Sequence, residues 1–470
     1  MEKKTKIVAT ISNLKCDIPF LTELYEAGMN VVRLNTAHMT TDNALEVISN
    51  VRSVSEKLAI MVDTKGPEIR TVAMDDAMDV KEGDAITVKG IPDGESGNGV
   101  LCVSYSGIVD DVPVGSHLLI DDGDISLEVT GKEESALLCV VENDGAIKGR
   151  KSINIPDVSI NLPALTEKDI EFVKFSAEHD VDFIAHSFVR KREDVLEVQA
   201  ILDDMNSDCK IIAKIENQEG LDNIDEILDY AFGAMIARGD LAIEIPAERI
   251  PLIQKELVKT CVERRKPVII ATQMLHSMIH APRPTRAEVS DVGNACLDGT
   301  DAIMLSGETA NGKYPVEAVK TMTRIALQIE ETRSTFNDTP YPDENQITDY
   351  LTKAAVKAAL RLPTKALIAD TLTGRTVRGM AAYRGENPIY AQCYSKRVMR
   401  ELALSFGVHC DYMKLNQSSN EFLHEALTRL MGDGFFTEED LIVVLAGHFG
   451  ADNGASFVEI STAQNLLSRA

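Results

Sequence analysis

The sequence predicts an α/β protein in three parts: a (β/α)₈ TIM barrel, a small β-barrel lid domain that interrupts it, and a C-terminal α/β three-layer domain. Three observations predict this class. Short apolar runs that end in polar residues alternate with amphipathic segments, one long gap breaks the alternation, and a polar stretch with two prolines precedes a second alternating region. Near-continuous apolar strands that alternate with helices pair in parallel, and eight such units close a barrel.

The barrel strands are expected where the chain has short apolar runs, because a strand buried on both faces is apolar throughout. These runs are Lys6–Ile11, Val31–Asn35, Ile60–Lys65, Asp182–Val189, Lys210–Glu216, Ala234–Asp240, Val268–Met274 and Ala302–Ser306. Segments with helical spacing lie between most of them: Asp42–Lys57, Thr166–Glu178, Asp194–Asp203, Ile250–Arg265 and Pro315–Glu331. We therefore assign residues 1–66 and 164–335 to the barrel.

The gap between Lys65 and Asp182 is too long for one helix. Residues 67–163 are rich in Val, Ile, Gly and Asp, and the stretch VPVGSHLLIDDGDISLEVTG alternates apolar with polar residues between turn signals. This pattern predicts a compact β domain inserted after the third barrel strand. The insertion point lies at the C-terminal rim of the barrel, where an extra domain is placed to act as a lid.

The region after Glu331 predicts a linker and a further domain. Residues 336–345 carry the two prolines and many polar side chains, which is typical of a linker. Residues 346–470 predict a separate α/β domain. Its helices are expected at 346–361, 375–384, 395–405 and 419–432, and its strands at 366–369, 388–391 and 441–445.

Charge and cysteine usage limit the partners and the compartment. The chain has 48 basic and 74 acidic residues, a net charge of −26, which argues against nucleic acid or an anionic membrane as a partner. The spacing of the eight cysteines does not match that of metal ligands, which indicates reduced thiols. No apolar run reaches the ~18 residues that a membrane span needs, and no signal-peptide pattern is present. We expect a cytoplasmic protein without a membrane partner.

Two charged pairs close neighbouring predicted strands. Residues two apart on a strand point to the same face, so Lys214 is expected beside Glu216 and Arg238 beside Asp240. Two carboxylates and two cations at adjacent strand ends suit a divalent metal together with a phosphate. Each pair by itself also fits an ordinary ion pair at a barrel rim, and that alternative stays open at this point.

The other predicted strand ends are polar as well, which favours a site at the rim. Mg²⁺ prefers oxygen ligands, so Glu216 and Asp240 suit it. Lys214 would neutralise a phosphoryl group or an enolate, and arginines at the rim would hold phosphate oxygens. The remaining polar strand ends are Arg33 and Asn35, Asp63 and Lys65, Ser187 and Arg190, Thr272 and Gln273, and Ser306 and Glu308.

Gly239 follows the sixth predicted strand, and two interpretations of it are open. If it opens a short helix, its backbone N–H could approach a substrate carboxylate; the alternative is a plain turn glycine. The chemistry also has an alternative, because a lysine at a barrel strand end could form a Schiff base in an aldolase-like lyase. The carboxylates of Glu216 and Asp240 argue against this, since they would keep Lys214 protonated.

Long motifs in these segments resemble the pyruvate kinase family, through the barrel, the insertion and the linker, and more weakly after about residue 340. The resemblance implies the same three-part architecture, with subunits assembled as a homotetramer. It also implies transfer of the phosphoryl group of phosphoenolpyruvate to ADP, giving pyruvate and ATP, the last step of glycolysis. The motifs are MNVVRLNTAH (29–38), DTKGPEIRT (63–71), KIENQEG (214–220), MIARGDL (235–241), ATQMLHSMI (271–279), PRPTRAEVSDV (282–292) and DAIMLSGETANGKYP (301–315).

The resemblance also implies residue roles. Lys214 would stabilise phosphoryl and enolate charge, Glu216 and Asp240 would bind Mg²⁺ or Mn²⁺, and Thr272 would lie near the protonated carbon, within a relay that includes Ser306. Arg33, Gly239, Asp240 and Thr272 would contact substrate, and Arg70, His38 and Lys151 the nucleotide. Arg238 would have a supporting role, such as orienting a carboxylate.

Many members of the family need K⁺, and here the implied site is incomplete. Asn35, Asp63 and Thr64 match, and Glu68 matches the residue that accompanies K⁺ dependence, but Ala37 stands where the family has serine. We predict that activity still responds to K⁺ with weakened affinity. Further departures are Ser12-Asn13 for a Gly-Pro pair, which leaves the nucleotide preference open, Thr36 for an aromatic residue, and Ala242 for a glycine.

An effector loop is a further expectation. The segment TLTGRT (371–376) precedes a helical pattern and resembles the family's phosphate-binding loop, for a sugar phosphate or AMP, through Thr371, Thr373, Gly374, Arg375 and Thr376. An ordinary N-capped turn is the alternative, because AGHFGADNGASF (446–457) replaces the family's final effector loop. The departures at Ala37, Thr36 and Asn13 leave one non-enzyme alternative, a member retained for effector binding or assembly.

Overall fold

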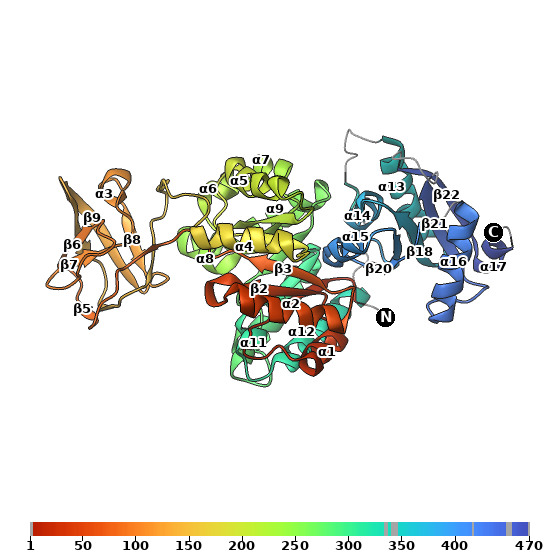
Figure 1. The fold of residues 1–470 in the computed structure, drawn as a ribbon, viewed down its shortest axis with the longest axis horizontal. Coiled ribbons are helices and arrows are strands. Elements are labelled where there is room, and N and C mark those ends of the chain that lie inside the picture. The colour runs from red at the N-terminus through yellow and green to blue at the C-terminus, as the bar shows by residue number, and fades with distance from the viewer. Residues whose placement is uncertain (1–2, 333–336, 340–345, 416–417, 448–453, 469–470) are drawn as a thin grey trace.

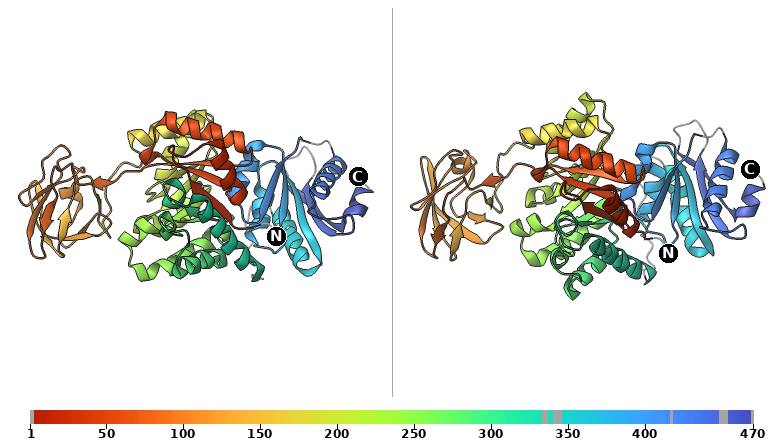
Figure 2. Two further views of the ribbon diagram at one scale, coloured as in Figure 1. Left: turned by 90° about the horizontal axis from the view of Figure 1, so that it is seen from below. Right: turned by 60° about the horizontal axis from the view of Figure 1, so that its bottom comes forward.

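The computed structural model describes residues 3–332, 337–339, 346–415, 418–447 and 454–468. Three parts follow one another along its longest axis (Figures 1 and 2). A β-rich part stands off one side of a barrel surrounded by helices, joined to it by extended segments. An α/β part packs against the opposite side of the barrel. The predicted succession of barrel, inserted β domain and C-terminal α/β domain is therefore confirmed at the level of fold class.

Eight parallel strands close the barrel in the order β1-β17-β16-β15-β14-β13-β3-β2. Each of the eight predicted runs overlaps one of them, although β3 and β15 begin one residue before the predicted run, and only β2 ends where its run was predicted to end. The other strands stop one to three residues earlier, because the polar residues at the rim leave the hydrogen-bonded ladder. The strands are β1 (Lys6–Thr10), β2 (Val31–Asn35), β3 (Ala59–Asp63), β13 (Phe183–His186), β14 (Lys210–Ile215), β15 (Gly233–Ala237), β16 (Val268–Ala271) and β17 (Ala302–Leu305).

Helices cover the outside of the barrel, and their ends carry recognisable stop and start signals. Thr166 and Thr285 form capping boxes at the starts of α4 and α10, and Gly28 ends α1 with a left-handed backbone at φ 116°. The helices that follow the barrel strands are α1 (Ile18–Ala27), α2 (Thr41–Val54), α4 (Glu167–Glu178), α5 (Arg192–Asp204), α6 (Gln218–Asp222), α7 (Ile224–Tyr230), α8 (Arg238–Glu244), α9 (Ile250–Glu263), α10 (Arg286–Asp298), α11 (Gly307–Ala310) and α12 (Pro315–Thr332), the last two after the final strand β17.

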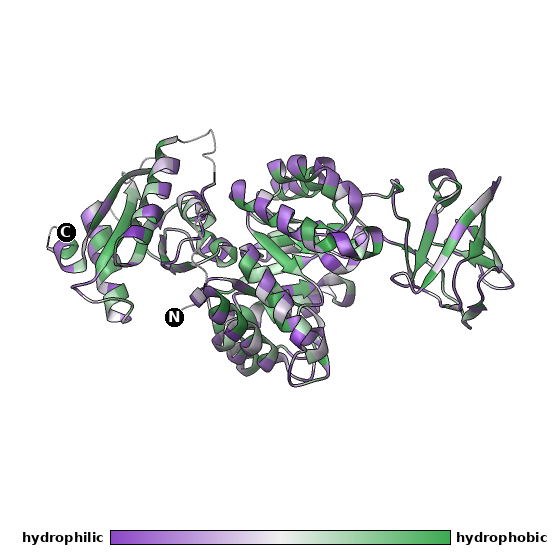
Figure 3. Ribbon diagram, turned by 180° about the vertical axis from the view of Figure 1, so that it is seen from behind, coloured by the Kyte–Doolittle hydropathy of each residue, from purple (hydrophilic) through white to green (hydrophobic). Residues whose placement is uncertain are grey.

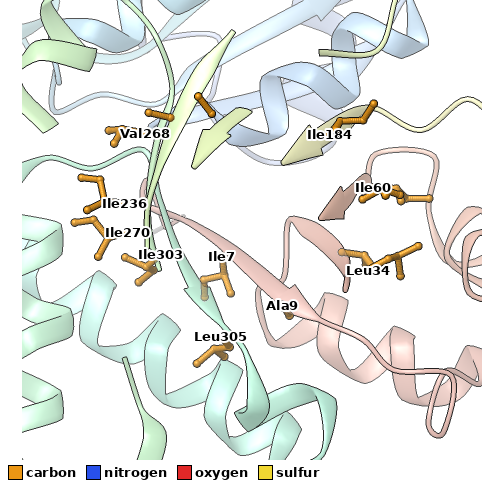
Figure 4. Packing of buried hydrophobic residues seen from close by; sticks show 14 of the residues in the cluster. Ile7, Ala9, Leu34, Ile60, Ile184, Ile236, Val268, Ile270, Ile303 and Leu305 are labelled. Carbon is orange, nitrogen blue, oxygen red and sulfur yellow. The ribbon is translucent and has the colours of Figure 1, made fainter. Parts of the chain in front are cut away.

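Two apolar layers hold the barrel together, and the strand alternation separates them. Ile7, Ile60 and Ile236 point outward and pack between the strands and the helices, as Figure 4 shows. Val8 and Met61, one residue away in each case, point into the barrel. Because side chains alternate along a strand, the next inward positions at the carboxyl ends fall on the polar rim residues.

The inserted part is a seven-stranded sheet with its own apolar core. Its edge strands β4 and β7 continue into a single bridge between Thr71 and Val103, which brings the two edges of the sheet together. The order is β4 (Ile69–Arg70), β12 (Ser152–Asn154), β8 (His117–Ile120), β9 (Ile125–Glu133), β10 (Ala136–Val141), β6 (Ala85–Lys89) and β7 (Val100–Cys102), with β5 (Met78–Val80) and β11 (Gly145–Ile147) as a separate pair and α3 (Ile108–Asp111) between β7 and β8.

The C-terminal part is a five-stranded sheet in the order β20-β19-β18-β21-β22, with a separate core on each face. Three layers result, as predicted, and Figure 3 shows the apolar strands inside and mixed helices outside. The strands are β18 (Thr364–Thr371), β19 (Ile389–Cys393), β20 (Val408–Tyr412), β21 (Leu441–Gly447) and β22 (Ala455–Thr462). The helices are α13 (Gln346–Arg361), α14 (Arg375–Ala382), α15 (Lys396–Glu401), α16 (Ser419–Gly432) and α17 (Ala463–Leu467).

The C-terminal region differs from the prediction at one helix and two strands, and parts of two predicted segments lie outside the described residues. The predicted helix 395–405 ends at Glu401 and continues as a short 3₁₀ turn, η4 (Leu402–Leu404), and the edge strands β20 and β22 were not predicted. Most of the predicted linker, residues 336 and 340–345, lies outside the described residues, as does 448–453 of the segment 446–457. The domain boundaries at 66/67 and 163/164 stay predictions. In the part of the chain that the structure describes, every helix is too short or too polar to cross a membrane.

Candidate active site

The rim of the barrel brings together three charged side chains that the sequence placed at separate strand ends. Arg33 on β2, Asp63 on β3 and Lys214 on β14 each stand two residues beyond an apolar side chain of the barrel interior, so all three point inward. They are between 1% and 8% exposed. Buried charges of this kind persist only when they are paired.

Lys214 is paired on three sides. Its Nζ lies 2.9 Å from Glu216 Oε1 and 3.2 Å from Asp63 Oδ1, and it donates a hydrogen bond of 2.7 Å to Ser187 Oγ. Burial by itself disfavours the ammonium form, but the charges of Asp63 and Glu216 outweigh burial and raise the pKa of Lys214. The ammonium is therefore retained at neutral pH.

Asp63 joins the two cations. Its Oδ2 lies 2.5 Å from Arg33 Nε, and Arg33 Nη1 donates to Thr10 Oγ1 at 3.0 Å. Burial would raise the pKa of Asp63, but Arg33 and Lys214 together lower it below its usual value. The carboxylate therefore stays ionised, and it fixes the guanidinium and the ammonium on one side of the rim.

Glu216 and Asp240 form the acidic side of this cluster. Glu216 is 2% exposed, and its Oε2 accepts a hydrogen bond of 2.7 Å from the backbone N–H of Phe188. Burial and the charge of Glu216 raise the pKa of Asp240 to about 7. A carboxylate whose charge is disfavoured by burial and by a second carboxylate nearby suits a divalent cation, which would neutralise both.

This donor set fits Mg²⁺ better than a metal held by side chains alone. Within the described ranges, no group of three or more His, Cys, Asp or Glu side chains could hold a metal ion. Mg²⁺ is commonly bound through one or two carboxylates, with waters and substrate oxygens as its other ligands. Glu216 and Asp240 at an open rim meet that need.

Arg238 does not pair with Asp240, and the prediction that these two residues end a strand is wrong. β15 stops at Ala237, and Arg238 is the first residue of α8. Its Nη1 lies 2.6 Å from Asp291 Oδ1 on α10, and its Nη2 donates to the carbonyl of Thr272 at 3.0 Å. Once the chain turns into a helix, residues two apart no longer share a face, so Arg238 points away and braces the loop after β16.

Gly239 is the second residue of the short helix α8, so it lies in a helix start, in line with one of the two sequence interpretations. Its N–H donates a hydrogen bond of 2.7 Å to Thr272 Oγ1. Thr272 and the following Gln273 have left-handed backbones with φ of 70° and 54°. A β-branched residue in this region is a backbone outlier, and such strain tends to gather at functional sites. The structure thus brings Thr272 against Gly239 at the rim.

Ser306 follows β17 at the same rim and precedes α11. Its backbone N–H donates to Glu308 Oε2 at 2.7 Å, and Glu308 also accepts from the N–H of Leu275. Glu308 is therefore a brace for the loops after β16 and β17. The Ser306 side chain is partly exposed, which leaves it accessible from the rim.

A cleft of about 750 Å³ lies between the inserted sheet and the barrel rim. Arg70 and Lys151, which the resemblance assigns to the nucleotide, line it together with Asp240, Asp121 and Glu244. Arg70 pairs with Glu68 at 2.7 Å, and Lys151 pairs with Asp121 at 2.8 Å. Both cations are therefore held within the cleft by neighbouring carboxylates.

His38 is not among the residues that line the cleft. It ends the short 3₁₀ helix η1 (Thr36–His38) after β2, and it is exposed. The structure therefore does not bring His38 together with Arg70 and Lys151. The sequence implied this grouping only through the resemblance, and no spacing argument could have tested it.

The predicted ligands of a monovalent cation come from two adjacent strands. Asn35 on β2 is the parallel partner of Asp63 on β3, so both side chains point to the same side. The carbonyl of Thr64 follows directly and accepts a hydrogen bond of 2.7 Å from Ser187 Oγ. Ala37, in η1, offers only a methyl group. Carboxylate, amide and carbonyl oxygens suit a hard cation, so the set fits K⁺ with one side-chain oxygen fewer.

The candidate effector loop joins β18 to α14. Gly374 has a left-handed backbone with φ of 77° and donates its N–H to Thr371 Oγ1 at 2.8 Å. Thr373 and Arg375 are exposed, and Thr376 is partly exposed. The loop is thus a turn closed by a threonine hydroxyl at a helix start, which agrees with both interpretations that the sequence left open.

Ser187 is the residue that sequence reasoning named at a strand end without giving it a role. It is 1% exposed, and its hydroxyl contacts Lys214 and the carbonyl of Thr64. Asp291 was also missed as the partner of Arg238, and Glu244 as a residue of the cleft. Only for Ser187 was there a usable signal, a polar residue directly after an apolar strand.

Comparisons with known proteins agree with this geometry. A family model described as pyruvate kinase, barrel domain, matches residues 2–319, and one described as pyruvate kinase, alpha/beta domain, matches residues 349–461. A pyruvate kinase of Borreliella burgdorferi is 46% identical over 473 residues, 99% of each chain. A pyruvate kinase of Geobacillus stearothermophilus is 43% identical, over 100% of this chain and 82% of the relative.

A solved structure agrees as well. The crystal structure of a pyruvate kinase from Cryptosporidium parvum superimposes with a TM-score of 0.92 at 33% identity, covering 98% of this chain and 96% of that one. The likeness extends over the barrel, the inserted sheet and the C-terminal part together. On the family models and the near-full-length relatives, this chain belongs to the pyruvate kinase family.

Proposed function

We propose that the chain transfers the phosphoryl group of phosphoenolpyruvate to ADP and protonates the resulting enolate to pyruvate. The observation that carries this proposal is the ammonium of Lys214, kept charged by Asp63 and Glu216 at the inner rim of the barrel. In the reaction, the bond between phosphorus and the enol oxygen breaks, and a β-phosphate oxygen of ADP forms the new bond. The enolate then takes a proton on its terminal carbon.

Each rim residue has a role in this proposal. Lys214 and Arg33 neutralise negative charge on the phosphoryl group, and Lys214 also stabilises the enolate oxygen. Gly239 and Thr272 position the substrate carboxylate. The N–H of Gly239, which donates to Thr272 Oγ1 in the structure, would donate to that carboxylate instead. Thr272 and Ser306 belong to the path by which a proton reaches the enolate. These groups mostly orient charges and hydrogen bonds.

Two kinds of cation serve the reaction. Glu216 and Asp240 would hold Mg²⁺ or Mn²⁺, which supplies positive charge to the oxygens of the phosphoryl group and the enolate. Asn35, Asp63 and the carbonyl of Thr64 would hold K⁺. Ala37 lacks a hydroxyl, so with these three ligands alone K⁺ would activate the enzyme at higher concentrations than a site with a fourth protein oxygen would need.

The nucleotide lies in the cleft beneath the inserted sheet. Arg70 and Lys151 would exchange their partners Glu68 and Asp121 for phosphate oxygens of ADP. His38 would reach the nucleotide only from outside the cleft, so its contribution is expected to be smaller. Closure of the inserted domain over the cleft would exclude water from the phosphoryl transfer.

The remaining elements of the proposal concern regulation and assembly. A sugar phosphate or AMP would bind at the loop formed by Thr371, Thr373, Gly374, Arg375 and Thr376, and would shift the saturation curve for phosphoenolpyruvate. The subunits would assemble as a homotetramer in the cytoplasm, and contacts between subunits would couple the two sites. Addition of a sugar phosphate or AMP without any shift of that curve would contradict the effector assignment.

The experiment for the reaction is a coupled assay of pyruvate formation from phosphoenolpyruvate and ADP. We expect turnover that requires Mg²⁺, stops on chelation and rises on addition of K⁺. Borohydride treatment in the presence of substrate should leave the protein unmodified, because Lys214 stays protonated. Absence of pyruvate formation with all components present would contradict the proposed function, and a trapped adduct on Lys214 would favour the lyase alternative.

A further inference from the structure

The hydroxyl of Ser187 lies within the proposed monovalent cation site, although the family resemblance gave it no place there. Ser187 directly follows β13, which pairs with β3 so that Ala185 lies opposite Asp63. Its Oγ is 2.7 Å from the carbonyl oxygen of Thr64 and 3.4 Å from Asp63 Oδ1. Two of the three proposed K⁺ ligands are therefore direct neighbours of this hydroxyl.

The bonding of Ser187 leaves room for a cation on its oxygen. A hydroxyl has one proton to donate and two lone pairs. The proton points to the carbonyl of Thr64, and one lone pair accepts from Lys214 Nζ at 2.7 Å. Among the described residues, Lys214 is the one hydrogen-bond donor to this oxygen, so the second lone pair is available to a cation. A cation that contacts Asp63 and the Thr64 carbonyl would lie beside it.

The loop that carries Ser187 is held in place from both sides. The N–H of Ser187 donates to Thr64 Oγ1 at 3.0 Å, and the next residue, Phe188, donates its N–H to Glu216 Oε2 at 2.7 Å from a left-handed backbone with φ of 55°. A Cβ on Gly66 would lie 2.8 Å from Ser187 Cβ, so only glycine at position 66 lets the backbone approach Ser187 this closely. Ser187 cannot move without displacing a proposed Mg²⁺ ligand.

We propose that Ser187 supplies the oxygen that is missing at Ala37, and that it thereby links the monovalent cation to Lys214 as a positioning residue. The inference rests on the proposed function, because it assumes that a monovalent cation binds beside the transferring group. In this chain, the hydroxyl for the cation comes from the β13 side of the rim, whereas at position 37 it would come from the β2 side. The same oxygen contacts both the cation and the lysine ammonium.

A binding measurement tests the proposal without relying on turnover. Affinity for K⁺ is measured through competition with thallium(I) observed by thallium NMR, and through the rise of the melting temperature with K⁺ in a tetramethylammonium background. The variants are Ser187→Ala, Ala37→Ser and the double variant. We expect Ser187→Ala to weaken K⁺ binding about tenfold, the size typical for loss of a group around a metal.

The double variant separates a ligand from a merely structural residue. Ala37→Ser should gain little in the wild-type background, because Ser187 already provides the oxygen. It should restore most of the lost affinity in the Ser187→Ala background. Unchanged K⁺ affinity in Ser187→Ala, or an equal gain from Ala37→Ser in both backgrounds, would overturn the proposal.

Two controls distinguish the loss of a K⁺ ligand from a general loss of structure. Ser187→Cys preserves the size of the side chain with a poor ligand for K⁺, and it replaces the alanine variant if that variant does not fold. Ser176→Ala removes another buried serine hydroxyl, which donates to the carbonyl of Phe172, and should leave K⁺ affinity unchanged. Wild-type protein that forms pyruvate while Ser187→Ala keeps its K⁺ affinity contradicts only this inference. Absence of pyruvate formation would contradict the proposed function itself.

Discussion

At the scale of single residues, the site depends on buried charges that share partners. Asp63 contacts both Arg33 and Lys214, and Lys214 contacts Glu216 and Ser187 in addition. Such a cluster resists replacement of any one member, because the remaining charge would be buried without a partner. The cluster therefore preorganises positive charge where a phosphoryl group would lie.

His186 is a second buried ionisable residue, and it is not satisfied. It is fully buried beside Ser187, and among the residues that the structure describes neither ring nitrogen has a hydrogen-bond partner. Burial lowers the pKa of His186 to about 4, in spite of Asp194 and Asp169 nearby. Below the ordinary histidine pKa of about 6.5, the unfolded chain takes up a proton that the folded chain refuses. This residue therefore costs stability as the pH falls from about 6.5 towards about 4.

We predict that His186→Leu stabilises the protein. At about pH 7, the free energy of unfolding should rise by about 1–3 kcal/mol, the cost of burying unpaired polar atoms. The gain should be larger at about pH 5, where the unfolded wild-type chain is protonated at this position. Urea unfolding at both pH values measures this, with His424→Leu on the exposed face of α16 as the control. A variant less stable than wild type at both pH values would contradict the prediction.

The sequence predicted part of the residue geometry. Lys214 and Glu216 do lie together, because the alternation of a strand holds to its last residues. Arg238 and Asp240 do not, because the chain turns into α8 at that point and the same spacing then separates side chains. Nothing in the local sequence marks this switch. Asp291, the actual partner of Arg238, is 53 residues away along the chain.

At the scale of elements, Arg190 holds the return segment of the inserted domain. Its Nη1 and Nη2 donate to the carbonyls of Ile160 and Leu162, each at 2.8 Å. Its backbone N–H and Nε are oriented by Asp194 at 2.8 and 3.4 Å. The connection from the inserted sheet to the barrel is thereby fixed just beyond β13. The position of the lid thus depends on a residue next to the catalytic strand ends.

We predict that Arg190→Met weakens nucleotide binding. Release of the connection should make closure of the cleft less favourable by about 1 kcal/mol, which corresponds to roughly a fivefold higher KM for ADP. The KM for phosphoenolpyruvate should change less, because its proposed contacts are on the barrel. Steady-state kinetics with each substrate measures both values.

The control for this variant is two residues away. Arg192→Met removes an exposed side chain that pairs only with its neighbour Glu193 among the described ion pairs, and it should leave both KM values unchanged. Equal KM values for ADP in Arg190→Met and wild type would show that the connection does not need this clamp.

Strands and helices were predictable where their surroundings are uniform. The barrel strands are buried on both faces, so their apolar runs are visible in the sequence. The strands β20 and β22 were missed because both are edges of their sheet, and all but the first residue of each is at least partly exposed, as in VHCDY for β20. A short edge strand has little periodicity of its own, and its pairing partner determines it.

At the scale of the whole molecule, a buried ion pair joins the C-terminal part to the base of the barrel. Arg384 Nη2 lies 2.7 Å from Asp301 Oδ2, with side chains only 2% and 5% exposed. Arg384 Nε also donates to the carbonyl of Gly299, and Asp301 Oδ1 accepts from the N–H of Phe406. Three segments, at residues 299–301, at Arg384 and at Phe406, thus meet at one pair of charges. These residues are isolated in the sequence, so no pattern could have predicted the interface. The three-part layout was predictable, because the alternation of apolar runs and helical segments is interrupted once and then followed by a linker pattern.

We predict that Arg384→Met destabilises the protein by about 3–5 kcal/mol, because Asp301 would stay buried without its partner. Arg324→Met is the control, since the side chains of its ion pair with Glu317 are 61% and 42% exposed and the pair should contribute at most about 1 kcal/mol. Chemical unfolding of Arg384→Met, Arg324→Met and wild type measures the loss of unfolding free energy in each variant. Similar losses in both variants would mean that the interface does not depend on the buried pair.

The most direct measurement compares turnover in Lys214→Met and Lys210→Met by the coupled assay of pyruvate formation. Both lysines belong to β14, but Lys210 lies at the opposite end of the strand, near Glu401. We predict that Lys214→Met loses about a thousandfold or more in turnover, since the charge of Lys214 acts in the transition state. Lys210→Met should retain wild-type turnover. Undiminished pyruvate formation by a folded Lys214→Met variant would contradict the central assignment.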